Sequence, residues 1–301
     1  MGKIRVVVDS SADFPAPSVV DRYGITVVPN RIHFGSESYV DGTDMDADAF
    51  FKRASREDVY PQISPPTVEQ YTEVFTRLAR ETDKIVSLHT SRTINSSWQN
   101  AKAATQTLLG RCQIEVIDSQ TTSAGLGLLT EITAKIIEKT PSLDEVVRQI
   151  RGTITRIYSI FYVDTLDYIK HGALIGEAQA VLGTMLGIKP FLTIEDGHLI
   201  TMEKARTRSQ AVDKLVEFVL EFGAVDQVII LQNSPFITES VRMLQDRLSA
   251  ELGKRDYITI LYGPTLGASL GLDATGVVVL ESEEQPDYDP VDDFPLKDDD
   301  L

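Results

Sequence analysis

Residues 84–138 read KIVSLHTSRTINSSWQNAKAATQTLLGRCQIEVIDSQTTSAGLGLLTEITAKIIE, and this stretch indicates the fold class of the protein. The runs at 84–89 and 114–118 are short, apolar and rich in β-branched residues, as buried strands are. The segments at 95–109 and 122–138 have the period of helices instead. This alternation of strand and helix predicts a largely parallel sheet with helices on its faces.

The preceding residues extend the same pattern. We expect short strands at 4–9, 25–29 and 31–34, and helices at 15–23, 46–53 and 67–80. Thr67 followed by Gln70 is the sequence pattern of a capping box, which predicts that the last of these helices begins there.

The second half of the chain predicts a second α/β lobe. We expect helices at 142–154, 209–222 and 237–252, strands at 156–163, 227–231 and 257–262, and a strand at 277–280 that completes a sheet. The segments 188–194 and 198–202 flank Glu195-Asp196-Gly197, a pattern that predicts a hairpin. The expected organisation is an N-terminal lobe (1–155), a C-terminal lobe (156–280) with a ligand cleft between the two, and a disordered acidic tail (281–301).

The negative charge of the chain is concentrated at its C-terminus. The formal net charge is −16, and the ten acids and one lysine of residues 281–301 contribute −9 of it. Nucleic-acid binding needs clustered lysine and arginine, so this balance argues against a nucleic-acid partner. No run approaches the ~18 apolar residues of a membrane span, and Met1 leads into a strand without a signal-peptide pattern. We therefore expect a cytoplasmic protein. Cys112 is the only cysteine and is expected to be a buried core residue.

Hydroxyl side chains follow three of the predicted strands. Ser10 and Ser11 come after Asp9, Thr90 and Ser91 after His89, and Ser119 after Asp118. Ligands of parallel α/β sheets collect at the carboxyl ends of the strands. The pattern predicts a small-molecule site at this edge.

Enzyme motifs are mostly missing from the sequence. There is no Gly-x-x-x-x-Gly-Lys-Ser/Thr phosphate loop, and Gly125-Leu126-Gly127 lacks the third glycine of a dinucleotide fingerprint. Asp44, Asp46 and Asp48 have the opening spacing of a calcium loop, but alanine stands where that loop needs glycine. The four histidines, at 33, 89, 171 and 198, lack the spacing of metal ligands, so we expect no metal ion. Only His89 ends a strand beside the hydroxyl loops, where acid–base chemistry would need it; a structural role fits it better.

Four segments, taken together, point to a family. They are VDSSAD at 8–13, PQISPPT at 61–67, the run from His89 to Ala101 that ends in WQNA, and a run from LDYIK at 166–170 through GIKP at 187–190 to KAR at 204–206. In this order and spacing, across about residues 4–280, they resemble the DegV family of bacterial fatty-acid-binding proteins.

The resemblance implies a lipid-binding protein that holds one long-chain fatty acid between two lobes and uses no cofactor. It places the carboxylate at hydroxyl groups of the second and third segments. Some members present the fatty acid to a separate kinase that phosphorylates the carboxylate to an acyl phosphate. By the resemblance, this chain is then a non-catalytic, substrate-carrying subunit. The ligand-binding candidates are Ile63, Ser64, Asn95, Ser96, Ser97, Arg206 and Ser269.

Four of the matched positions depart from the family pattern. Ile63 stands where the family usually has threonine, and Asn95 where it has serine. Leu174 replaces an arginine and Ser269 a histidine. The head-group site is therefore expected to be remodelled. Arg206 is the candidate positive charge near the carboxylate, and a surface ion pair explains this arginine equally well.

Other interpretations of the sequence remain open. Ile160–Tyr162 and Val181–Leu186 are candidate linings of an apolar tunnel, although core packing also explains them. One alternative function is a hydrolase or transferase that acts on a small acidic molecule through a loop serine and His89. Another is an interaction protein that works through its acidic tail.

Overall fold

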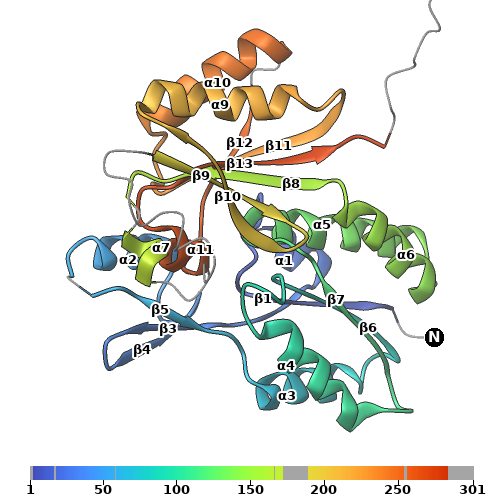
Figure 1. The fold of residues 1–301 in the computed structure, drawn as a ribbon. Coiled ribbons are helices and arrows are strands. Elements are labelled where there is room, and N and C mark those ends of the chain that lie inside the picture. Colours follow the sequence, from blue (N-terminus) through green and yellow to red (C-terminus); the bar gives the residue numbers. More distant parts are fainter. Residues whose placement is uncertain are drawn as a thin grey trace, which may run out of the picture.

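The computed structural model describes residues 3–16, 18–57, 59–165, 167–171, 189–253 and 256–283. Leu174, Val181–Leu186 and most of the acidic tail lie outside these residues. Figure 1 shows a main sheet in each lobe, with helices outside and between them, and a small additional sheet formed by β3, β4 and β5.

The first sheet is parallel throughout, as the sequence predicts. Its order is β2-β1-β6-β7, with bounds Thr26–Val28, Arg5–Asp9, Lys84–His89 and Gln113–Asp118. His89 pairs with Asp118, and Asp9 pairs with Val28. The polar residues that follow these strands are therefore gathered at one edge of the sheet.

Helices cover both faces of this sheet. On one face lie α3 (Val68–Leu78) and α4 (Ser97–Ala104), and on the other lie α1 (Ser18–Tyr23), α5 (Ser123–Lys139) and α6 (Leu143–Ile154). Alternate strand residues supply the two cores: Val6 and Val8 pack with α5 and α6, while Val7 packs with α3. The predicted capping box at Thr67 and Gln70 is confirmed at the start of α3.

The second sheet is mainly antiparallel and has the order β10-β9-β8-β13-β11-β12. The bounds, in chain order, are β8 Ile157–Tyr162, β9 Lys189–Glu195, β10 His198–Ala205, β11 Val225–Gln232, β12 Ile258–Leu261 and β13 Thr275–Glu281. The predicted hairpin is confirmed as β9–β10. β13 lies inside the sheet, where it pairs with β8 and β11. Its side chains alternate between two cores: Val278 and Leu280 pack into one, and Val277 and Val279 into the other.

One face of the second sheet carries α9 (Arg208–Leu220) and α10 (Glu239–Leu252), as Figure 1 shows. The other face packs against α5 and against two helices that were not predicted from the sequence, α7 (Asp167–His171) and α11 (Pro264–Leu270). Helix α5 thus lies between the two sheets and contributes apolar residues to a core on each side.

The Gly125-Leu126-Gly127 stretch has a packing role in α5. A Cβ atom at Gly127 would lie 2.1 Å from the carbonyl oxygen of Asp13, so only glycine lets the helix approach the loop after β1.

A small antiparallel sheet, β4-β3-β5, lies beside α11. Its bounds are β3 Arg31–Phe34, β4 Glu37–Val40 and β5 Gln62–Ser64, and α2 (Ala47–Ala54) packs on it. Strands β4 and β5 were not predicted, because both are short and flanked by polar residues. Asp46 caps α2 through its side chain, which agrees with a helix start rather than a calcium loop.

Candidate functional site

A buried carboxyl group, that of Asp9, lies at the edge of the first sheet, at the end of β1. Its side chain is fully buried. Its carboxylate accepts hydrogen bonds from the Ser11 backbone N–H (3.1 Å), the Thr90 backbone N–H (3.2 Å) and the Ser97 hydroxyl (2.9 Å), and it lies 3.1 Å from His89 Nδ1. Burial alone would raise its pKa. The bonds and charge supplied by His89, with the bonds from Ser11 and Ser97, outweigh burial and hold the pKa below its usual value.

His89 lies at the centre of this network and is also fully buried. Its Nε2 lies 2.7 Å from Ser87 Oγ, and its Nδ1 lies 3.3 Å from both Ser97 Oγ and the Tyr71 hydroxyl. The Tyr71 hydroxyl in turn lies 2.5 Å from Ser97 Oγ. The network therefore ties β1 and β6 to α3 and α4.

The serines outside the strands are not placed around His89 as in a Ser–His–Asp catalytic triad. In a triad the carboxylate and the serine contact different nitrogens of the imidazole ring. Here Asp9 and Ser97 both contact Nδ1. Ser87 does lie at Nε2, but it is a fully buried residue inside β6 and not a loop serine. The geometry gives no support to the alternative of a loop serine activated by His89.

A second polar cluster surrounds Asn30, between β2 and β3. Asp41 accepts a hydrogen bond from the Ser10 hydroxyl at 2.7 Å, and the same hydroxyl accepts the Asn30 backbone N–H at 2.9 Å. Burial raises the pKa of Asp41 to about 7; the nearby charges of Asp13 and Asp9 add to the rise, against the opposing bond from Ser10.

Both clusters extend to helices that lead into the second lobe. The Asn30 amide donates to Ser11 Oγ and to Thr265 Oγ1, each at 3.0 Å, and Thr265 belongs to α11. Asp13 accepts the Gly263 backbone N–H at 3.0 Å and the hydroxyl of Ser123, the first residue of α5. Burial raises the pKa of Asp13 to about 6, although both of these bonds oppose the rise.

Three of the predicted residues, Asn95, Ser96 and Ser97, belong to the third segment, the run from His89 to Ala101. Ser97 is part of the network around Asp9 and His89. Asn95 is partly buried, and its Oδ1 accepts the Ser97 backbone N–H at 2.8 Å at the start of α4. Ser96 is exposed, and its side chain makes no capping bond.

Ile63 and Ser64, the predicted residues of the second segment (61–67), lie on β5. Ser64 Oγ lies 2.9 Å from His33 Nε2, whereas Ile63 packs into the apolar cluster of the small sheet and α2. Asn100 on α4 donates to the Pro66 carbonyl at 2.8 Å, which places the second and third segments side by side.

Of the last two predicted residues, Ser269 adjoins the Asn30 cluster, whereas Arg206 lies apart from both clusters. Ser269 on α11 donates to the Thr265 carbonyl at 2.8 Å. Arg206 is exposed at the end of β10, where its backbone N–H donates to the side chain of Gln210. No contact places Arg206 beside the loops of the first lobe in the part of the chain that the structure describes.

Several members of the site were not predicted from the sequence, among them Tyr71, Asn30, Asp41 and Thr265. The Tyr71 position follows a helical period typical of core residues, and Asn30 is an isolated polar residue between two strands. Asp9 could have been found, because it ends a buried strand directly before the hydroxyl pair.

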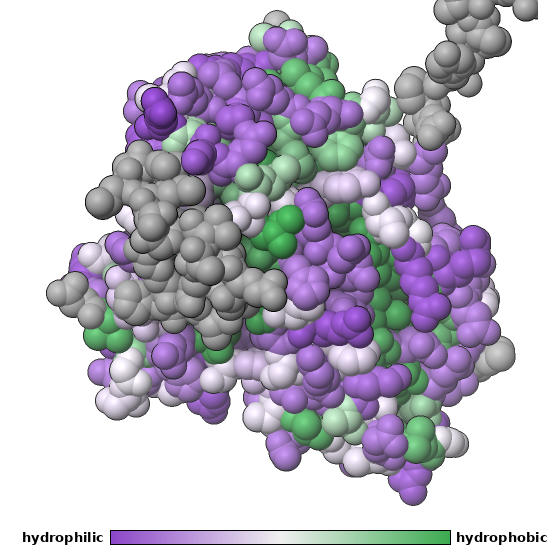
Figure 2. Space-filling model, viewed as in Figure 1, coloured by the Kyte–Doolittle hydropathy of each residue, from purple (hydrophilic) through white to green (hydrophobic). Residues whose placement is uncertain are grey.

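An apolar region adjoins these polar loops. The core between the second sheet and helices α5, α7 and α11 includes Phe161, Leu192, Tyr262, Leu266 and Leu270. Of the predicted tunnel segment Ile160–Tyr162, only Phe161 faces this region, because alternate residues of a strand point to opposite faces. Figure 2 shows a mostly hydrophilic surface with narrow hydrophobic patches across the middle of the molecule.

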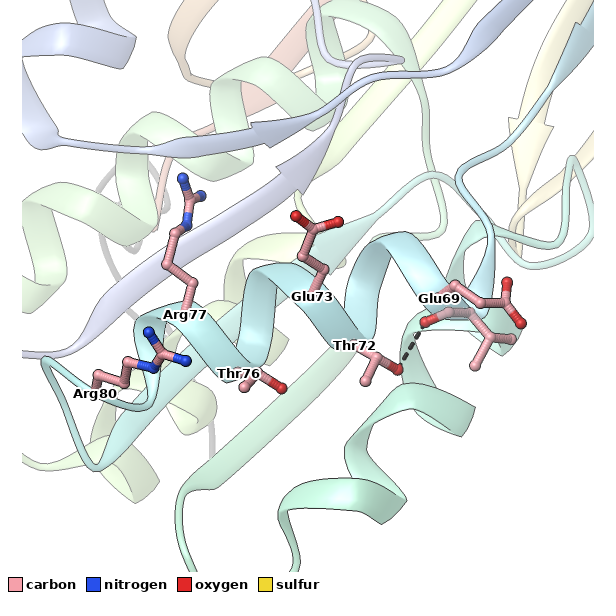
Figure 3. Close-up of a pocket in the computed structure, with 7 residues that line it drawn as sticks. Glu69, Thr72, Glu73, Thr76, Arg77 and Arg80 are labelled. Carbon is pink, nitrogen blue, oxygen red and sulfur yellow. Dashed lines mark hydrogen bonds between the residues drawn. The ribbon is translucent and has the colours of Figure 1, made fainter.

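A separate open hollow lies along the outer face of α3, away from these clusters. Figure 3 shows that Glu69, Thr72, Glu73, Arg77 and Arg80 line it. Apart from Val68, its lining residues are charged or polar types, unlike the hydrophobic and aromatic residues that line most small-molecule sites. Among the described residues, no group of His, Cys, Asp and Glu could hold a metal ion, and no helix is long and apolar enough to cross a membrane.

Comparison with known proteins shows where this fold occurs. A family model described as "Uncharacterised protein, DegV family" matches residues 3–282. The chain belongs to the DegV family. A DegV domain-containing protein of Caldanaerobacter subterraneus subsp. tengcongensis is 30% identical over 280 residues, which cover 92% of this chain and 98% of the relative.

Two solved structures share the fold over 93–94% of this chain. A DegV family protein of Streptococcus agalactiae, described as fatty acid binding, matches with a TM-score of 0.86 and 22% identity, over 94% of this chain and all of the other. A stearic-acid-binding protein of Eubacterium ventriosum matches with a TM-score of 0.80 and 23% identity, over 93% of this chain and 98% of the other. The α/β fold with two lobes is that of the DegV family.

Proposed function

We propose that this chain binds one fatty acid between its two lobes and acts as a binding protein rather than an enzyme. One observation carries the proposal: α5 and α11 both begin at the polar loops and continue into the apolar region between the lobes. In α11, Thr265 contacts Asn30, while Leu266 and Leu270 lie in the apolar core. A ligand with a polar head and an apolar tail fits such a path. Fatty acids are what the Streptococcus DegV family protein and the Eubacterium stearic-acid-binding protein bind.

The acyl chain would supply most of the binding energy. Burial of a methylene group contributes about 0.8 kcal/mol, so ~14 methylenes contribute roughly 11 kcal/mol before the costs of association. A neutral hydrogen bond contributes only about 0.5–1.5 kcal/mol. The departures at Ile63 and Ser269 therefore weaken head-group recognition without removing the main driving force.

For the head group, we propose a site formed by the two neighbouring segments at Ser64 and at Asn95–Ser97. The Asn95 amide N–H₂ and the Ser96 hydroxyl are donors near the start of α4. Ile63 and Ser269 would border this site. Arg206 stays a candidate for an ion pair with the carboxylate.

Co-purified lipid provides the first test. The protein is expressed, denatured in organic solvent and examined by mass spectrometry, and one equivalent of fatty acid is expected. The delipidated protein is then titrated with stearic acid and with methyl stearate, and its thermal midpoint is followed. Stearic acid is expected to raise the midpoint more than the ester, because only the acid offers a carboxylate to the polar loops.

Two results would decide against the proposal. The first is the absence of both co-purified fatty acid and any thermal shift across several chain lengths. The second is an equal effect of acid and ester, which would leave acyl binding standing but remove the carboxylate site.

We also propose that the bound carboxylate is the substrate of a separate kinase, which transfers a phosphoryl group from ATP to give an acyl phosphate. This chain has no phosphate-loop motif of its own, so a second protein would bind the nucleotide. Trapping of the acyl phosphate with hydroxylamine, in a mixture of loaded protein, candidate kinase and ATP, would test this step. The cytoplasmic location and the lobe boundary between residues 155 and 156 stay predictions from the sequence.

A further inference from the structure

The turn of the β9–β10 hairpin contacts the loop between β6 and α4. Asp196 and Gly197 form this turn with φ angles of +49° and +82°. The Thr93 hydroxyl donates a hydrogen bond to the Gly197 carbonyl oxygen. Figure 1 shows the hairpin extending from the upper sheet towards the lower lobe. A turn of the second lobe thus holds a loop of the first.

The fit between turn and loop is close. A Cβ atom at Gly197 would lie 2.4 Å from Ser91 Oγ and 3.5 Å from Gln120 Cα. The positive φ angle favours glycine at this position, and an added Cβ would displace the Ser91 hydroxyl.

From this contact, a series of hydrogen bonds leads to the proposed head-group site. Thr93 Oγ1 lies 3.1 Å from Ser91 Oγ, and the Ser91 carbonyl accepts the backbone N–H groups of Ile94 (2.9 Å) and Asn95 (3.2 Å). The Asn95 side chain then accepts the Ser97 backbone N–H at 2.8 Å. The conformation of residues 91–97 is therefore fixed between Asp9 on one side and the hairpin turn on the other.

We infer that Thr93 and Gly197 are positioning residues for lipid binding: the hairpin turn of the second lobe holds the head-group loop of the first in its binding conformation. This inference rests on the proposed function. A loop held in its bound conformation loses less conformational entropy when the ligand binds, so removal of the contact lowers affinity without removing any group that touches the ligand.

The Thr93 hydroxyl can be removed with little change of shape. Thr93→Val is expected to weaken the binding of stearic acid about three- to tenfold, the range of one lost hydrogen bond. Thr93→Ser keeps the hydroxyl and is expected to bind like the wild type. Thr72→Val is the matched control: Thr72 donates to the Val68 carbonyl within α3, on the face drawn in Figure 3, and does not contact the hairpin.

Gly197→Ala tests the same contact from the other lobe. Gly253→Ala is its control, because Gly253 also has a positive φ angle (+65°) but has no atom within 4 Å of the added Cβ. We expect Gly197→Ala to weaken stearic acid binding and Gly253→Ala to lower only the thermal midpoint.

Hydrogen exchange reports on the loop without lipid. Exchange of the Asn95 amide, which is bonded to the Ser91 carbonyl, is expected to be faster in Thr93→Val and unchanged in Thr72→Val. If the wild type binds stearic acid and both Thr93→Val and Gly197→Ala bind it with the same affinity, this inference alone is overturned. A wild-type protein that binds no fatty acid would overturn the proposed function and the inferred effect on affinity together, whatever the exchange rates.

Discussion

At the residue scale, three carboxyl groups near the edge of the first sheet differ in their protonation because their partners differ. Asp9 has several donors and the His89 ring beside it, so its pKa lies below the usual value. Asp13 and Asp41 accept fewer hydrogen bonds, and burial raises their pKa values to about 6 and about 7. Close to neutral pH, this edge therefore changes its charge.

The charge on Asp41 is expected to make stability depend on pH. Its pKa is about 7 in the folded protein against an ordinary value of 3.8, so the folded state retains a proton that the unfolded chain releases. This contribution is fully present below about pH 4 and is lost as the pH rises through about 7. Between these pH values the free energy of unfolding is expected to fall by up to about 4 kcal/mol, since one pKa unit corresponds to about 1.4 kcal/mol. Asp41→Asn should remove this pH-dependent fall.

Urea unfolding at a series of pH values between 4 and 8 measures this difference. Asp21→Asn is the control, because Asp21 is exposed on α1. Parallel stability profiles for the wild type and Asp41→Asn would show that Asp41 is ionised like a surface carboxylate.

At the element scale, helix α11 is placed by a close approach to α2. A Cβ atom at Gly267 would lie 2.7 Å from the Phe50 ring, so the two helices pack closer than alanine allows. In contrast, Gly152 on α6 has open space around its Cα. The same substitution therefore has opposite consequences in the two helices.

Gly267→Ala is expected to destabilise the protein by about 1–3 kcal/mol, because the added methyl group overpacks the core. Gly152→Ala is expected to stabilise it by roughly 0.5–1 kcal/mol through its better helix propensity. Denaturant midpoints of the two variants and the wild type provide the comparison. A gain in stability for Gly267→Ala would mean that α11 can move away from α2.

Strong local patterns explain which elements were predicted from the sequence. The apolar strands of the first sheet and the long amphipathic helices were found, and so was the β9–β10 hairpin with its Asp-Gly turn. Helix α11 was missed because it has seven residues, two of them proline and glycine, and most of its surface is buried. Its helical form depends on its surroundings more than on its composition.

At the scale of the whole molecule, α5 joins the lobes through shared cores. Leu126 and Leu129 pack under the first sheet, and Ala124 and Leu128 pack under the second. Neither sheet can lose α5 without exposing apolar surface. The two lobes are therefore coupled by packing as well as by the bonds at Asp13, Asn30 and Thr93.

We expect this coupling to give a single unfolding transition. Trp98 is the only tryptophan and lies on α4 in the first lobe, so its fluorescence reports on that lobe alone. Far-UV circular dichroism reports on both lobes. The two midpoints are expected to coincide, and stearic acid is expected to raise both equally. Separate midpoints would show that the lobes unfold independently.

The order of strands and helices in the first sheet, and the polar character of its edge, could be predicted from the amino-acid sequence. Both follow from short-range periodicity and from residues adjacent in the chain. The order of the four motifs also indicated the DegV family, and Ser97 was among the site candidates.

Which polar residues hydrogen-bond to one another depends on tertiary packing. Asp9, Tyr71, Asn30 and Thr265 come from distant parts of the chain, and their hydrogen bonds depend on how the sheets pack together. The position of β13 within its sheet likewise comes from long-range pairing, as does the contact of Thr93 with Gly197. Periodicity describes the neighbours of a residue along one element, whereas these contacts arise between elements after packing has fixed their distance.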